Sequence, residues 1–303
     1  MADWSDILRE LQQAGSNFDT VRRKYLKELS QYTGRNVIVY YSGWLQKQGS
    51  NNVIINDLDK NAFMTTIKGL DRTIGLDLIL HTPGGETAAT ESIIDYLCSM
   101  FDDIRAVVPQ LAMSGGTMIA CSSDKILMGK HSSLGPIDPQ FGGIPAHGLL
   151  EEFKKASEEI KIDLSKIHVW QPILQKYNPT ILGEAQKVID WSESIVSDRL
   201  AARMFKTMRD KKKKTSLIKN IIKELGDHSL NLSHARHLSS SKCKLMGLKV
   251  EDLEDDQKLQ EKVLSVHHAM MHTLAATMAL KIVENQNGVA YIQQAPVVQS
   301  VIK

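Results

Sequence analysis

The stretch from Leu76 to Gln140 constrains the fold most, because short apolar runs alternate there with glycine-bearing turns and a segment of helical period. The helical segment, Glu86 to Met100, places its larger apolar side chains on one side. The predicted strands are Val37 to Tyr41, which precedes this stretch, and Leu76 to Leu80, Ile104 to Val108 and Lys125 to Met128 within it. Strands that alternate with helices in this way are typical of an α/β protein with a mostly parallel, helix-covered sheet.

Two of the turns carry residues suited to acyl chemistry. The first reads HTPGG and ends at Gly85, where a strand meets a helix, so its glycines free the backbone to point N–H groups outward. The second reads AMSGG and predicts a nucleophile elbow with the Ser114 hydroxyl exposed. Together they indicate attack by Ser114 on a carbonyl whose oxygen is held by the N–H groups of Gly85 and Gly115. An ordinary tight turn and a serine N-cap are the plainer alternatives.

The rest of the chain is predicted to be mainly helical. An N-terminal arm of two helices covers residues 4–33, breaks near Gly15 and ends at Gly34. Helical period also covers residues 146–161, 180–208, 216–225 and 257–284. The basic run RDKKKK, residues 209–214, is interpreted as a solvated link between helices, with a patch for a nucleic acid or an acidic partner as the alternative. The segment from Asn285 onward is predicted to be a flexible or swapped tail.

Composition and charge limit the partners and the compartment that the sequence predicts. The 303 residues carry 37 Lys and Arg against 35 Asp and Glu, a net charge of +2, so no nucleic-acid partner is expected from charge. No apolar run reaches the roughly 18 residues of a spanning helix, and the N-terminus lacks the features of a signal peptide. Cys98, Cys121 and Cys243 lie in apolar settings, so we expect buried thiols in a cytoplasmic protein, with no metal site and no cofactor.

Three motifs carry a family resemblance. TPGG after one strand, SGGTMIA after the next and HSSLGPIDPQ after a third resemble the serine dehydrogenase proteinase family. That family is similar to the signal peptide peptidase A group and, more distantly, to the proteolytic subunit of Clp protease and the crotonases. The resemblance is specific over residues 75–140 and extends to about residue 255. It implies an α/β Clp/crotonase-like fold of repeated ββα units with a helix-rich C-terminal half, a nucleophile at Ser114, and an oxyanion hole formed by the Gly85 and Gly115 amides.

A serine nucleophile needs a general base, and the sequence offers histidine and lysine candidates for this role. The Clp subunit uses a Ser-His-Asp triad, but the matching stretch SLGPID holds no histidine, and His131 lies just upstream. The signal peptide peptidase group uses a lysine, which acts as a base only when its pKa falls toward neutrality. Lys187, near the start of a long predicted helix, is preferred over Lys155, because the glutamates around Lys155 favour its charged form. His131 as the base, and Lys187 as an ordinary solvated lysine, are the alternatives.

These observations predict a cytoplasmic serine peptidase with a Ser-Lys dyad, acting on peptides or unfolded proteins. The expected parts are an N-terminal helical arm (residues 1–34), a catalytic domain (35–255) and a C-terminal helix and tail (256–303). The resemblance implies a homo-oligomer. An ATPase or a membrane protein is a candidate partner. Two alternatives stay open: a crotonase-like enzyme that acts on an acyl-CoA with Glu86 as its carboxylate, and an inactive assembly protein of the same fold.

Overall fold

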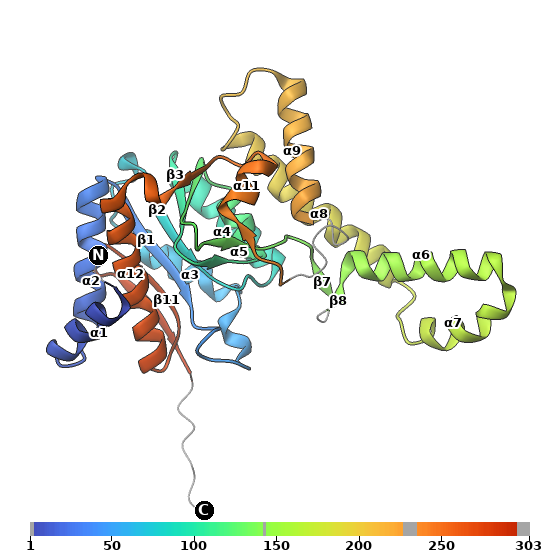
Figure 1. Cartoon of the computed structure of the whole chain (residues 1–303), viewed down its shortest axis with the longest axis horizontal. Coiled ribbons are helices and arrows are strands. Elements are labelled where there is room, and N and C mark those ends of the chain that lie inside the picture. Colours follow the sequence, from blue (N-terminus) through green and yellow to red (C-terminus); the bar gives the residue numbers. More distant parts are fainter. Residues whose placement is uncertain (1–2, 142–143, 227–234, 296–303) are drawn as a thin grey trace, which may run out of the picture.

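The computed structural model describes residues 3–141, 144–226 and 235–295. Across these residues a central sheet has seven strands in the order β10-β5-β3-β2-β1-β11-β12 (Figure 1). All neighbours are parallel except that β11 runs antiparallel to both β1 and β12. The strands are β1 (Asn36–Ser42), β2 (Leu76–His81), β3 (Ile104–Val108), β5 (Lys125–Met128), β10 (Val250–Asp252), β11 (Ala279–Asn285) and β12 (Ala290–Gln294).

Two small sheets lie outside the central one. One has the order β4-β6-β9, with strands Leu111–Ala112, Ser133–Leu134 and Leu238–Ser239. The other pairs β7 (Gln140–Phe141) with β8 (Ile144–Pro145). The four predicted strands are confirmed, and so is the predicted α/β class with a mostly parallel, helix-covered sheet.

Helices cover both faces of the central sheet. Strands β1 and β2 are buried on both sides, so their alternate side chains pack into two apolar layers, one on each face of the sheet. One layer contains α1 (Trp4–Gln13), α2 (Phe18–Thr33) and α12 (Gln257–Ala276). The other contains α3 (Leu58–Ile67), α4 (Thr87–Met100), α5 (Gly115–Cys121), α8 (Ile181–Ala202), α9 (Lys211–Gly226) and α11 (Ser240–Met246).

The predicted N-terminal arm forms as two helices, and Gly34 ends α2 in the left-handed conformation. α2 is attached to the C-terminal part of the chain. Arg22 of α2 is 1% exposed and its Nε donates to Glu284 of β11 over 2.9 Å. The division of the chain at residues 34 and 255 stays a prediction. The N-terminal helices α1 and α2 contact the C-terminal helix α12 on one face of the sheet.

Three expectations about the C-terminal half are wrong. Residues 211–214 are the first turn of α9, not a link, because the Asp210 side chain accepts the Lys213 amide at 3.0 Å and caps the helix. The helix expected through residue 284 ends at Ala276, because the chain then pairs with β1 as β11. The segment after Asn285 contains β12, while residues 296–303 of the predicted tail lie outside the described residues.

A further helix, α7 (Ile167–Leu174), follows α6 (Ala146–Ile162) and was not expected. The two form a hairpin that projects away from the sheet (Figure 1). Three of its side chains are largely exposed although they are apolar: Ile162 (88%), Leu164 (77%) and Val169 (64%).

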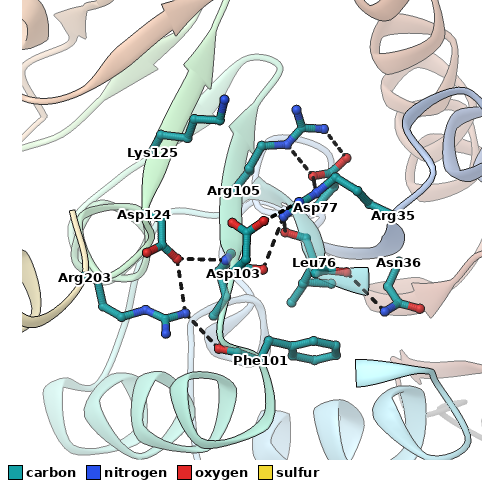
Figure 2. Close-up of polar contacts among 12 residues, drawn as sticks. Arg35, Asn36, Leu76, Asp77, Phe101, Asp103, Arg105, Asp124, Lys125 and Arg203 are labelled. Atoms are coloured by element: carbon teal, nitrogen blue, oxygen red, sulfur yellow. Dashed lines mark hydrogen bonds and ion pairs between the residues drawn. The ribbon is translucent and has the colours of Figure 1, made fainter. Parts of the chain in front are cut away.

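A network of charged side chains links the amino ends of the parallel strands (Figure 2). The glycine turns follow the carboxyl ends of these strands. Arg105 donates twice to Asp77, each bond 2.6 Å long, and Arg35 bridges Asp77 and Asp103. Gly75 has φ +70°, and a Cβ there would lie 2.7 Å from the Arg35 guanidinium. The positive φ favours glycine at this position, and the absence of a Cβ leaves room for the Arg35 guanidinium beside it.

Candidate active site

Ser114 stands on a strained strand-to-helix turn between β4 and α5. Its φ of 50° and ψ of −113° are unusual for a residue with a side chain, a type of strain that clusters at functional sites. The side chain is half-buried. The next residues must be small, because a Cβ on Gly116 would lie 2.6 Å from the Thr82 methyl group. The sequence S-G-G therefore forms the elbow that its pattern predicts.

The Thr82–Gly85 turn follows β2 and is pinned from one side by Ile55. The Ile55 amide donates to the Gly84 carbonyl at 2.8 Å, and the Ile55 carbonyl accepts the Glu86 amide at 3.0 Å. In such a parallel bridge the N–H and C=O of the residue in between, Gly85, point away from Ile55. A Cβ on Gly85 would lie 2.3 Å from the backbone of Ile55, so only glycine fits between the two segments.

The two turns meet. A Cβ on Gly84 would lie 2.7 Å from both the Ser114 Cβ and the Gly115 nitrogen, and a Cβ on Gly115 would lie 3.5 Å from the Gly85 nitrogen. Neither the Gly85 nor the Gly115 amide has a hydrogen-bond acceptor among the residues that the structure describes. Two free donors beside one hydroxyl are the arrangement that stabilises a tetrahedral oxyanion.

Ser114 and both glycines line one cavity of about 470 Å³. Its wall is largely apolar, which lowers the local dielectric and strengthens hydrogen bonds to a developing charge. Glu86 also lines it, as the residue that precedes α4. The apolar lining includes Ile54, Met118, Ile137 and Val188.

A larger cavity of about 700 Å³ lies between α6, α8 and α9, lined by His147, Glu151, Glu193 and Lys219 among others. Burial raises the pKa of Glu193, and nearby His147 opposes this shift. Because this cavity contains neither Ser114 nor the two free amides, its greater size does not make it the better candidate for acyl chemistry.

The predicted bases are not brought to Ser114. Within the described part of the chain, no lysine or histidine lines its cavity. Lys187 is 74% exposed and its ammonium donates to Glu184 at 3.0 Å, although the next residue, Val188, lines the cavity. Lys155 lies on the projecting hairpin with its ammonium 6.0 Å from the Trp170 ring centroid. The ring of exposed His131 packs against Gly129.

Sequence reasoning missed the Ile54–Ile55 segment, which brackets Gly85. Its signal is slight: an apolar VII run after two asparagines, too short to stand out as a strand. It also missed the buried lysine next to this segment, Lys281, because β11 was expected to be helical. Burial lowers the pKa of Lys281, an effect that Asp59 opposes.

Comparison with other proteins gives relatives for part of the chain. Two uncharacterized proteins of Methanocaldococcus jannaschii are each 35% identical to it, one over 114 residues (36% of this chain, 39% of the relative) and one over 137 residues (43% and 46%). The chain thus spans less than half the length of these two relatives. Across residues 3–141, 144–226 and 235–295, no helix has both the length and the apolar character needed to cross a membrane.

Two solved structures are similar at a TM-score of 0.40. One is a mutant of the membrane-bound stomatin-specific protease 1510-N, with 18% identity over 69% of this chain and 79% of that one. The other is a mutant of ClpP1 from Listeria monocytogenes, with 12% identity over 77% and 99%. A family model described as ClpP-like SDH-type serine proteinase matches residues 18–263, which include both glycine-bearing turns, so the predicted Clp-like fold is confirmed. The chain belongs to the ClpP-like SDH-type serine proteinase family.

Proposed function

We propose that this protein is a serine peptidase with Ser114 as its nucleophile. The Ser114 Oγ attacks the peptide carbonyl carbon, and the Gly85 and Gly115 amides hold the resulting oxyanion. A base takes the hydroxyl proton and returns it to the leaving amine, after which water releases the acyl group. The observation that carries this proposal is the meeting of one strained serine and two free backbone donors at a single cavity.

The base is proposed to be a lysine, in a Ser-Lys dyad that is completed in a homo-oligomer. Lys187 is the first candidate because its neighbour Val188 lines the cavity, and Lys155 is the second because it lies on the projecting hairpin. The exposed apolar side chains of that hairpin support packing against another copy, since large exposed apolar patches mark interaction surfaces. His131 is the third candidate.

The proposed substrate is a peptide or an unfolded protein, with an apolar side chain in the cavity beside Met118 and Val188. An ATPase or a membrane protein that delivers substrate is a proposed partner. We place the protein in the cytoplasm, and its free cysteines, two of them buried, are compatible with a reducing compartment.

The test is hydrolysis of an unfolded protein by the purified oligomer, combined with labelling by a fluorophosphonate. Ser114→Ala is expected to lower kcat by about 10⁴-fold and to abolish the label. Lys187→Met, Lys155→Met and His131→Gln identify the base, because only its removal lowers kcat comparably. Hydrolysis by Ser114→Ala at the parental rate, or a label on another residue, would refute the proposal.

One observation favours a second candidate, acyl-thioester chemistry: Glu86, which carries a carboxylate, is among the residues that line the cavity with Gly85 and Gly115. There, the amides would polarise a thioester carbonyl and Glu86 would move a proton without covalent attack. Turnover of a CoA ester that survives Ser114→Ala but is lost in Glu86→Gln would support it. Absence of both activities and of any Ser114 label in the assembled protein would instead indicate an assembly protein.

A further inference from the structure

Lys281 is a fully buried lysine with a defined partner. It lies in β11, is 1% exposed, and its ammonium contacts Asp59 of α3 at 2.7 and 2.9 Å. The Tyr40 hydroxyl donates to the same carboxylate at 2.9 Å. The family match ends at residue 263, so the strand that supplies this cation lies beyond the matched region.

The pair holds both ends of the three-residue segment Ile54–Asn56. The Lys281 ammonium donates to the Ile54 carbonyl at 3.0 Å, and the Asn56 amide donates to the Asp59 carboxylate at 3.0 Å. Charge-assisted bonds of this kind are stronger than neutral ones. The segment is therefore anchored on each side of Ile55 by one buried ion pair.

Ile55, in turn, fixes Gly85. Its two hydrogen bonds reach the residues on either side of Gly85, namely Gly84 and Glu86. The Gly85 amide is thereby directed away from Ile55, and the Gly85 backbone is in contact with Ile55 with no space for a side chain. A shift of Ile55 must therefore shift the Gly85 amide.

Two other roles for Lys281 fit less well. Lys281 does not belong to the lining of the Ser114 cavity, and its ammonium is bound to Asp59 at 2.7 Å, so it is not placed to take the Ser114 proton. A purely stabilising role is also a weak explanation, because desolvation offsets most of the attraction in a buried ion pair.

We propose that the Lys281–Asp59 ion pair is a positioning unit that aims the Gly85 amide at the substrate carbonyl oxygen by anchoring Ile54–Asn56. This inference rests on the proposed function for its effect on catalysis. Its structural half, that the pair holds Ile55 against Gly84 and Glu86, is independent of any activity. Lys281 and Asp59 are positioning residues, since neither lines the cavity that would hold the substrate.

The test compares Lys281→Met, and the double variant Lys281→Met with Asp59→Asn, against Arg22→Met. The double variant leaves no buried charge without a partner, so it is less prone to unfold than Lys281→Met alone. Arg22→Met is the matched control, because it breaks an equally buried ion pair on the same strand, at Glu284, on the opposite face of the sheet. Each variant is measured for kcat and KM, and for hydrogen exchange of the Ile55 and Glu86 amides.

In the two Lys281 variants we expect kcat to fall about 100-fold with KM nearly unchanged. The Ile55 and Glu86 amides should exchange faster in these variants. In Arg22→Met, the folded molecules should keep the parental kcat and the parental exchange rates of these two amides. Unchanged kcat or unchanged exchange in the double variant would overturn the inference, as would an equal loss of kcat in Arg22→Met. If the parent shows no Ser114-dependent hydrolysis, the proposed function fails separately, and the exchange rates alone decide whether the ion pair anchors Ile55.

Discussion

Gly84 and Ser114 are packed so closely that a Cβ on Gly84 would lie 2.7 Å from the Ser114 Cβ. Gly84 also has φ +92°, which a residue with a side chain rarely adopts. We expect Gly84→Ala to push the Ser114 and Gly85 turns apart and to lower kcat by about 100-fold. Steady-state hydrolysis of an unfolded protein measures this loss.

Gly69→Ala is the control for Gly84→Ala. Gly69 has a similar φ of +82°, but no atom lies within 4 Å of the position of its Cβ. The control should lower the free energy of unfolding by about 1 kcal/mol through backbone strain and leave kcat unchanged. Equal kcat values for the two variants would contradict the packing argument.

Local pattern was enough to predict the elements that carry the two turns. Strands β1, β2, β3 and β5 and helix α4 follow from apolar period, and the S-G-G and P-G-G turns follow from backbone chemistry at strand ends. The meeting of Ser114 with Gly85 also follows, because the carboxyl ends of neighbouring parallel strands share one edge of a sheet.

Long-range contacts were beyond prediction. Lys281 and Ile54 are 227 residues apart, and nothing in either local segment indicates their hydrogen bond. The apolar residues that precede Asn285 fit a helix as well as a strand, and pairing with β1 decides between them. The choice of base is equally non-local, because the exposure of Lys187 depends on how α8 packs and not on its helical period.

Removal of Arg22 from its buried ion pair with Glu284 should destabilise the protein, because the Glu284 carboxylate stays buried with less charge compensation. Arg22→Met leaves the Glu284 carboxylate, 0% exposed, with Arg23 as a partly exposed partner. We expect the free energy of unfolding to fall by about 3 kcal/mol, as for other buried pairs that lose one member. Denaturant unfolding of the parent and the variant measures the difference.

Lys125→Met is the comparison for this experiment. Lys125 pairs with Glu251 at 2.8 Å, but both side chains are substantially exposed. Removal of such a pair should cost less than about 1 kcal/mol. A loss for Arg22→Met as small as that for Lys125→Met would show that α2 is held mainly by its apolar contacts with α12.

His81 makes the stability of this protein sensitive to acid. Its ring is buried among Tyr41, Trp44 and His267, and within the described ranges neither ring nitrogen has a hydrogen-bond partner. Burial therefore lowers the pKa of His81 from 6.5 to about 3. Burial likewise lowers the pKa of His267, and the neighbouring His81 adds to this shift.

Between pH 6.5 and about 3, the unfolded chain binds a proton at residue 81 that the folded chain does not bind. The free energy of unfolding should therefore be unaffected by His81 above pH 6.5 and fall by about 1.4 kcal/mol per pH unit below it. His81→Phe keeps a ring of similar shape and should remove this part of the slope, whereas His168→Gln, at an exposed site on α7, should not. Urea unfolding at pH 7, 6 and 5 measures the three slopes. An identical pH dependence for the parent and His81→Phe would mean that the folded protein admits a charged His81, which its apolar surroundings and unpaired nitrogens argue against.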